Sequence, residues 1–295
     1  MPNAMPVPAA ALMLASACTM ALTSCMDVPA GEPLSFEPVF DDEPVDYMGG
    51  RPFVISPDGL HLAFSLSGDD PSPDASMAEI GVRELEAVRI LDLPGGRPRA
   101  PAVGPTARRL LDDGHAPVPT LRCWGREGAI LFMPTTALGW FELDVRRSEL
   151  AWRSASNGGP SSGCPDRAPI RPPLLIGDFE VTATSGGGLR LERLPERRIV
   201  WESNAPLIRR HRLQGVALSP GGRRLIVLYS LALGSFSGPR RSVLVTDEAS
   251  PGVEVRVLQP ALLFAAWHPD GSEVFGYGPV AGQRHHGIFR ARPGS

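Results

Sequence analysis

The stretch that decides the fold is Pro52-Phe53-Val54-Ile55-Ser56-Pro57-Asp58-Gly59-Leu60-His61-Leu62-Ala63-Phe64. Pro57 pre-sets the backbone angle at the second turn position, Asp58 can bond its own backbone, and Gly59 accepts the left-handed conformation that closes the turn. Beyond the turn, apolar residues alternate with small or polar ones as far as Leu66, which is the period of a strand with two different faces. The stretch therefore predicts a β-hairpin.

The same turn pattern occurs three more times in the sequence. Ser219-Pro220-Gly221-Gly222 and His268-Pro269-Asp270-Gly271 are clear copies, and Gly125-Arg126-Glu127-Gly128 is a degenerate one. In each copy an apolar residue precedes the turn, and another follows the closing glycine by three places. The first set is Ile55, Trp124, Leu218 and Trp267, and the second is Leu62, Leu131, Leu225 and Val274.

The spacing of the turns gives the size of the repeating unit. The turns start at residues 56, 125, 219 and 268, so the intervals are 69, 94 and 49 residues. The middle interval holds two periods of 47, close to the ~40–45 residues of a four-stranded propeller blade. We therefore expect a blade with a diverged turn near residues 172–202, and insertions in the first interval.

These repeats resemble those of the TolB-like and WD40-like β-propellers. The resemblance covers about residues 51–291, is specific only at the turns, and implies an all-β propeller of four-stranded blades, five in number, with six as the alternative. TolB itself pairs its propeller with an N-terminal α/β domain, for which residues 26–50 are too few. The resemblance leaves function open.

Blade one is expected to have strands near 51–56, 60–66, 78–84 and 87–92, followed by a connection with one helical turn around Ala107–Leu111. Blade five shows only three strands, near 262–267, 272–277 and 286–291. We expect residues 34–40 to supply its fourth strand and close the ring, because an open sheet edge promotes aggregation.

Residues 1–24 are expected to be a signal peptide, because an apolar run of about 13 residues is too short to span a bilayer. Leu22-Thr23-Ser24-Cys25 resembles the bacterial lipobox and implies lipidation of Cys25. The basic residues usual in such a signal are missing before Arg51, which an upstream start would explain. A cleavable signal or a non-exported apolar leader stays an alternative. Residues 25–50, acidic and rich in proline, predict a tether, and residues 51–295 the propeller.

The composition is that of a folded chain, with 43% hydrophobic and 21% charged residues. All 29 basic residues are arginine, and the net charge is −3. Without the acidic stretch 26–50, which carries seven acids and no base, the remainder is +4. That excess is too small for a nucleic-acid-binding surface, so no nucleic-acid partner is expected.

Patterns that resemble catalytic or metal sites are weak. Gly159-Pro160-Ser161-Ser162-Gly163 has the letters of a nucleophile elbow but lies in a proline-rich loop with no helix after it. His285-His286 and the other histidines are scattered, and the acidic clusters lack calcium-loop spacing, so no metal and no cofactor are expected. Trp124 and Trp267 are expected to pack between neighbouring blades; a stacking surface at a central channel is the alternative.

Two cysteines remain if Cys25 is lipidated. In an oxidising compartment Cys123 and Cys164 are candidates for a disulfide, although their spacing does not show that they approach each other.

The predicted function is that of a non-catalytic lipoprotein of the bacterial cell envelope, periplasmic or on the outer-membrane side. Its propeller would bind an envelope protein or a small ligand, and only the lipid anchor would contact the membrane. The alternative is a propeller-type hydrolase or lactonase with a metal in the central channel, for which Asp178, Glu180 and His268 are the nearest candidates. Side chains converging on one axis would favour the enzyme.

Overall fold

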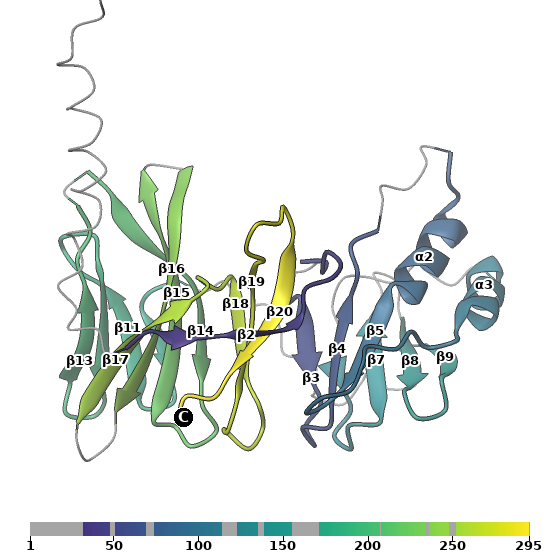
Figure 1. Cartoon of the computed structure of the whole chain (residues 1–295), viewed down its shortest axis with the longest axis horizontal. Helices are drawn as coiled ribbons and strands as arrows, with labels where there is room; N and C mark the ends of the chain where they lie inside the picture. The colour runs from purple at the N-terminus through teal and green to yellow at the C-terminus, as the bar shows by residue number, and fades with distance from the viewer. Residues whose placement is uncertain are drawn as a thin grey trace, which may run out of the picture.

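The computed structural model describes residues 32–47, 51–68, 74–113, 123–134, 139–154, 171–206, 208–233, 236–247 and 252–294. These residues form an all-β chain in which β-strands make five sheets and two helices cover one end (Figure 1). Sheets one, two, three, four and five are numbered by the order of their first hairpins along the chain.

Each sheet is built mainly from consecutive antiparallel strands. Sheet one contains β3 (Phe53–Ile55), β4 (His61–Ser65) and β5 (Val88–Asp92). Sheet two contains β6 (Cys123–Trp124), β7 (Ile130–Pro134), β8 (Gly139–Asp144) and β9 (Glu149–Ser154). Sheet three contains β10 (Leu174–Ile176), β11 (Phe179–Ala183), β12 (Leu189–Arg193) and β13 (Arg198–Ser203). Sheet three is the diverged unit that the spacing predicts near 172–202.

Sheets four and five each take a strand from the N-terminal segment. Sheet four contains β14 (Arg210–Leu218), β15 (Arg224–Leu233), β16 (Phe236–Asp247), β17 (Val253–Gln259) and, parallel to β17, β1 (Leu34–Ser35). Sheet five contains β18 (Phe264–Trp267), β19 (Val274–Pro279), β20 (His286–Ala291) and β2 (Glu37–Phe40). The pairing of β2 with β20 is antiparallel, with Glu37 opposite Arg290. The fourth strand expected for blade five from residues 34–40 is therefore present.

The four repeated turns share one hydrogen-bond pattern. In each, the amide of the closing glycine donates to the carbonyl oxygen of the first turn residue, at 2.8–3.0 Å. The closing glycines have φ between +68° and +75°. In the turn of sheet one, Asp58 Oδ1 accepts from the amide of Leu60 at 3.0 Å, and Ser56 Oγ accepts from the amide of His61 at 2.9 Å. These bonds fix the register of the hairpin that the sequence predicts.

One predicted strand is wrong, because residues 78–84 lie in a helix. The helix α2 (Met77–Glu86) begins with a capping box, in which Ser76 Oγ accepts from the Glu79 amide and the Glu79 carboxylate accepts from the Ser76 amide. Val82 and Leu85, at helical spacing, are buried. Sheet one consequently has three strands, and the helix takes the chain from β4 to β5.

The helical turn expected around Ala107–Leu111 is a longer helix, α3 (Gly104–Asp112), with a proline in its first turn. Ala107 and Leu111 are buried in one hydrophobic cluster with Val82 and Leu85 of α2. Both helices lie beside sheets one and two at one end of the molecule (Figure 1). Within the described residues, neither helix has the length and apolar character that crossing a membrane requires.

Hydrophobic clusters show which sheets are neighbours. One cluster joins sheets three and four, a second joins four and five, a third joins five and one, and a fourth joins one and two. The sheets are thus arranged in the order three, four, five, one, two, as they stand from left to right in Figure 1. No cluster of described residues joins sheet two to sheet three, so these residues form an open series and the expected closed ring is not present in them.

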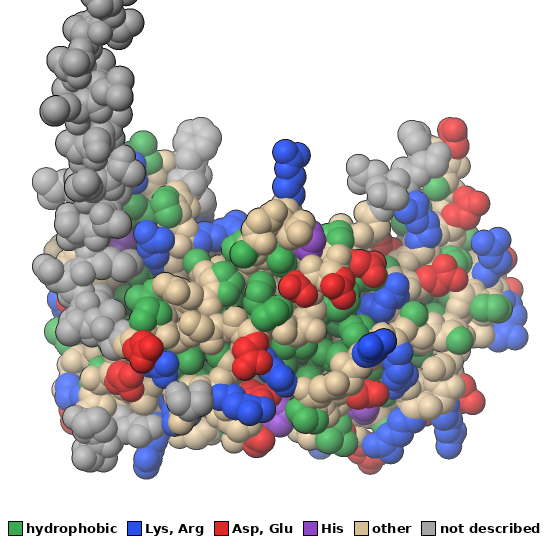
Figure 2. Space-filling model, in the orientation of Figure 1, with side chains coloured by type: hydrophobic (Ala, Val, Ile, Leu, Met, Phe, Trp, Pro, Cys, Tyr) green, Lys and Arg blue, Asp and Glu red, His purple; other side chains and the backbone are tan. Residues whose placement is uncertain are grey.

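The N-terminal segment is part of this core. Leu34 and Phe36 are buried between sheets four and five, and Phe40 is buried between sheets five and one. Part of the segment predicted as a tether therefore joins three sheets. Figure 2 shows hydrophobic side chains reaching the surface over the middle of this face, with many of the charged side chains around its edges.

Candidate ligand-binding site between sheets four and five

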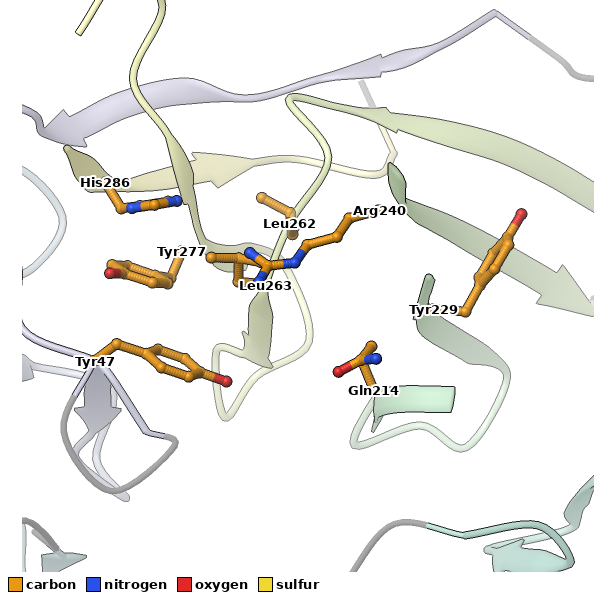
Figure 3. Close-up of a pocket in the computed structure, with 8 residues that line it drawn as sticks. All are labelled: Tyr47, Gln214, Tyr229, Arg240, Leu262, Leu263, Tyr277 and His286. Carbon is orange, nitrogen blue, oxygen red and sulfur yellow. The ribbon is translucent and has the colours of Figure 1, made fainter. Parts of the chain in front are cut away.

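A cavity of about 320 Å³ lies where sheet four meets sheet five (Figure 3). Its walls come from three parts of the chain: the segment after β2, the strands of sheet four, and sheet five with the residues before β18. The lining residues are Tyr47, Gln214, Tyr229, Arg240, Leu262, Leu263, Tyr277 and His286. The volume is at the lower end of the ~300–1,000 Å³ typical of small-molecule sites.

The register of sheet four places Arg240 in the wall. Arg240 pairs with Ser230, and Ser230 pairs with Arg212, so the three residues form one cross-strand row. A bulge between Leu213 and Gly215 interrupts the pairing, and there Gln214 donates from Nε2 to the buried Ser230 Oγ at 2.9 Å. The bulge thus re-aims a side chain toward the cavity, which is a common use of β-bulges.

Three rings form the opposite wall. The rings of Tyr47 and Tyr277 stack at 5.4 Å between centroids, and those of Tyr277 and His286 stack at 5.3 Å. The Tyr277 hydroxyl donates to the Val45 carbonyl oxygen at 3.1 Å, which fixes the middle ring. Tyr47 remains 45% exposed, and its hydroxyl end points toward the cavity (Figure 3).

The cavity has one strong charge. In Figure 3 the side chain of Arg240 extends toward Tyr277. Arg240 is exposed, and no carboxylate of the described residues forms an ion pair with it. Burial lowers the pKa of His286, and the electrostatic effect of its neighbours Arg240 and His285 lowers it further. Burial raises the pKa of Tyr277 to about 12 and that of Tyr229 to about 12. At neutral pH the histidine and both phenols are therefore uncharged.

A second cavity, of about 270 Å³, lies among the first strands of sheets one, two and five. Trp124 and Trp267 line it, but their indole N–H groups serve contacts between sheets. Trp124 donates to the Val54 carbonyl of sheet one at 3.1 Å, and Trp267 to the Ala217 carbonyl of sheet four at 2.9 Å. Both tryptophans thus pack between neighbouring sheets. The first cavity has more polar and ionisable side chains in its wall than the second and is the better candidate for a binding site.

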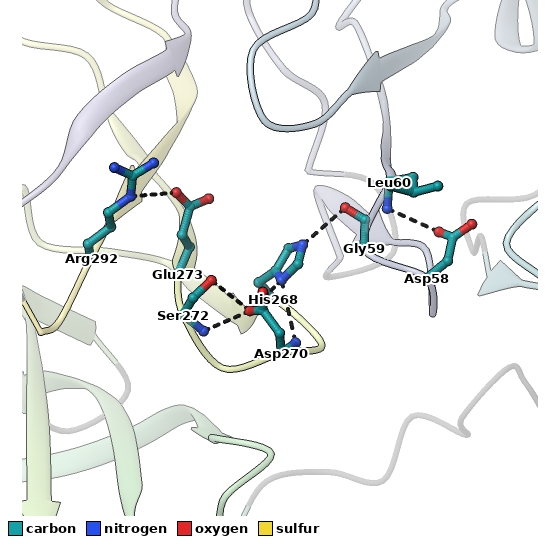
Figure 4. A network of polar contacts seen from close by, with 8 residues as sticks. All are labelled: Asp58, Gly59, Leu60, His268, Asp270, Ser272, Glu273 and Arg292. Atoms are coloured by element: carbon teal, nitrogen blue, oxygen red, sulfur yellow. Dashed lines mark hydrogen bonds and ion pairs between the residues drawn. The ribbon is translucent and has the colours of Figure 1, made fainter.

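The predicted turn residues lie along one rim of the molecule, where adjacent turns touch. His268 Nε2 lies 3.0 Å from the Gly59 carbonyl oxygen, and His268 Nδ1 lies 2.6 Å from Asp270 Oδ1 (Figure 4). Hydrogen bonds from Ser272 are the main cause that lowers the pKa of Asp270 to about 2. Gly271 faces Pro220, and Gly128 faces Asp58, so the turns of sheets four, five, one and two follow one another.

The residues considered for a metal site do not come together. Asp178 and Glu180 belong to sheet three, where their nearest cations are Arg193 at 3.7 Å and Arg197 at 3.3 Å. His268 lies on the rim of sheet five. Across the residues that the structure describes, no group of three or more His, Cys, Asp or Glu side chains has an arrangement suited to a metal ion.

The side chains of the adjacent histidines, His285 and His286, have different surroundings. His286 faces the cavity, whereas His285 points elsewhere and lies with Nε2 2.9 Å from the Asp41 carbonyl oxygen. Cys123 is disulfide-bonded, and its partner lies outside the described residues, so pairing with Cys164 stays a prediction. Cys25 and the motif at Gly159–Gly163 also lie outside them.

The sequence did not point to Tyr47, Gln214 or Arg240. Tyr47 lies within residues 25–50, which were predicted as a tether, and Arg240 lies in a strand without a motif. The one local signal is the pair Arg240-Arg241, because adjacent residues of a strand face opposite sides and only one of two cations can face a given wall.

No family model matches the chain, and no curated protein matches its sequence. Solved structures that resemble it include WD40 β-propeller domains. The C-terminal WD40 domain of Sif2 aligns over 89% of this chain and all of its own length, with 8% identity and a TM-score of 0.38. The RRP9 WD40 repeats align over 89% of this chain and 99% of their own length, with 8% identity and a TM-score of 0.39.

The hydrazine synthase of Kuenenia stuttgartiensis aligns over 80% of this chain and 74% of its own, with 12% identity and a TM-score of 0.33. All three TM-scores are low, and the description of the fold therefore stands on the sheets and turns given above.

Proposed function

We propose that this chain is a binding protein of the bacterial cell envelope. In this proposal sheets one to five are the blades of a five-bladed propeller, Cys25 carries the lipid anchor, and the ligand occupies the cavity between sheets four and five. The ligand is an envelope protein or a small molecule. Four turns of one pattern and the face-to-face packing of neighbouring sheets support the propeller.

The observation that carries the binding function is the composition of the cavity wall. A guanidinium without a carboxylate partner, an exposed amide and a stack of rings face one space. Sites for small ligands are concave and largely apolar, with a few polar groups that fix orientation. Arg240 is exposed at the cavity and has no carboxylate partner among the described residues, so its planar guanidinium is available to an anionic ligand.

The sequence Leu22-Thr23-Ser24-Cys25 supports the anchor, since it resembles the lipobox. Acyl chains on Cys25 would add about 0.8 kcal/mol per buried methylene and so hold the protein at the membrane. Residues between Cys25 and the first strand would set the distance of the cavity from the membrane.

The experiment is photo-crosslinking in the living cell with the full-length protein. A benzophenone amino acid replaces Gln214, which lines the cavity and is exposed, and in the control it replaces Leu60, which is 52% exposed on the turn of sheet one. We expect a covalent adduct from position 214 and none from position 60, with both variants melting as the unmodified protein does. Equal adducts from both positions, or none from 214, would refute the site.

A further inference from the structure

We propose that the ligand of this cavity carries a carboxylate next to a planar, uncharged ring, and that Arg240 binds the carboxylate while Tyr47 stacks on the ring. This inference rests on the proposed function and specifies its ligand class. It depends on three features of the site: the state of Arg240, the number of charges in the wall, and the geometry of the rings.

Several arginines of sheets three to five bind carboxylates, whereas Arg240 is exposed and lines the cavity. Arg193 and Arg198 both bind Asp247, at 2.9 and 2.6 Å, and Arg292 binds Glu273 at 2.8 Å. Arg240 has no such carboxylate among the described residues, although it extends into a lined cavity. A guanidinium presents a planar set of donors that matches the two oxygens of a carboxylate.

Arg240 is also the single cation of the wall. Arg212 occupies the same cross-strand row but does not line the cavity, and His286 is neutral at pH 7 because burial and Arg240 lower its pKa. A phosphate dianion is usually held by several cations or by a series of backbone amides. One guanidinium balances one carboxylate, so a monoanion fits the charge of this wall.

The rings supply the second half of the site. Tyr277 is fixed by its hydrogen bond to Val45, and it holds Tyr47 on one face and His286 on the other. Tyr47 is the exposed end of this stack, and Leu263 adds an apolar contact on the same side of the cavity (Figure 3). An aromatic ligand gains most from an offset or edge contact with such a ring.

The test is calorimetric titration of the full-length protein in detergent with three probes. These are 4-hydroxyphenylacetate, its neutral amide 4-hydroxyphenylacetamide, and acetate, which lacks the ring. The variants are Arg240→Gln and the matched control Arg241→Gln, which removes the same charge one residue further along the strand from a side chain that does not line the cavity. Melting curves verify that both variants fold.

We expect the aromatic acid to bind at least tenfold more tightly than the amide or acetate. Arg240→Gln should reduce binding of the acid at least tenfold and leave the amide unchanged, whereas Arg241→Gln should change binding of the acid less than twofold. Equal binding of acid and amide, or equal losses in both variants, would overturn the inference. The inference would also be overturned if neither the aromatic acid nor its amide bound. In that case an adduct at position 214 would show that the cavity takes a ligand of another class.

The carboxylate can belong to a free small molecule or to the end of a protein chain. A further arm therefore compares a hexapeptide that ends in tyrosine with the same peptide amidated at its C-terminus. Tighter binding of the free peptide than of 4-hydroxyphenylacetate assigns the site to a chain terminus, and weaker binding assigns it to a small acid. Both results support a ligand with a carboxylate next to a ring. That ligand class is rejected if the free and amidated peptides bind equally and the acid also binds no better than its amide.

Discussion

Gly59 and Gly222 occupy the same turn position in sheets one and four, but their surroundings differ. Both have positive φ, +73° and +68°. A β-carbon at Gly59 would collide with the His268 ring, whereas one at Gly222 would meet no atom within 4 Å. The pair therefore separates the cost of the backbone conformation from the cost of the contact between neighbouring turns.

Gly59→Ala should destabilise the protein more than Gly222→Ala. In both variants the free energy of unfolding should fall by about 1–2 kcal/mol, because an L-residue is strained at this φ. Gly59→Ala should lose about 1–3 kcal/mol more, since the His268 ring must move out of its contact with sheet one. Urea denaturation measures both free energies of unfolding, and equal losses would contradict the contact between the two turns.

Asp247 is a buried carboxylate that joins sheet four to sheet three. Burial alone would raise its pKa, but hydrogen bonds and charges from Arg198 and Arg193 outweigh burial and lower the pKa below its ordinary value. The folded protein thus binds this proton less readily than the unfolded chain does. The carboxylate therefore contributes stability above about pH 4, and the contribution is lost as the pH falls through the lowered pKa of the folded state.

Asp247→Asn should reduce the free energy of unfolding at pH 7 by about 3 kcal/mol, at the low end for a broken buried pair because both arginines keep some exposure to water. The loss should shrink as the pH falls below about 4. Asp178→Asn is the control, since Asp178 is 70% exposed and its ion pair with Arg193 is worth little. A loss in Asp247→Asn that does not depend on pH would reject the assigned role of the charge.

At the scale of elements, the N-terminal strands replace pieces that the repeats lack. The strand β2 completes sheet five, and Phe40 places its ring 4.9 Å from that of Phe64 in sheet one. The adjacent β1 adds to sheet four, so residues 34–40 connect three sheets. The energetic weight of this segment comes from its buried aromatic residues.

Phe40→Ala should destabilise the protein by about 3–5 kcal/mol, because the ring is buried and its removal leaves a cavity between sheets five and one. Glu37→Gln, in the same strand, should change stability by less than about 0.5 kcal/mol because Glu37 is exposed. Thermal unfolding of both variants provides the comparison. A small effect of Phe40→Ala would show that β2 is dispensable.

For the whole molecule, local sequence patterns predicted what local interactions determine. The turn beginning at Ser56 and its copies, sheet three and the strand near residues 34–40 could all be located from spacing and from turn chemistry. The strand expected at 78–84 is wrong because the capping box at Ser76 and Glu79 favours a helix where the apolar spacing is ambiguous. The cavity could not be predicted, because its wall combines Tyr47, Arg240 and His286 from segments that only the packing of sheets four and five brings together.

The proposed lipid anchor belongs to the scale of the whole chain. Cys25→Ser should abolish labelling by a fatty acid and move the protein from the membrane to the soluble fraction, with no change in its melting temperature. The reason is that acyl chains on Cys25 would supply the affinity for the membrane and would make no contribution to the core. Wild-type protein that is unlabelled and soluble would remove the envelope part of the proposed function and leave the cavity untouched.

The pairing of β2 with β20 limits when sheet five can fold during synthesis of the chain. Glu37 lies opposite Arg290, about 250 residues later in the chain, so β2 cannot pair until β20 has been synthesised. At ~5–20 residues per second the strand waits roughly ten to fifty seconds. During that time Leu34, Phe36 and Phe40 lack their core contacts. Contacts between residues so far apart in the sequence slow folding, and sheet five can be completed only after β20 has left the ribosome.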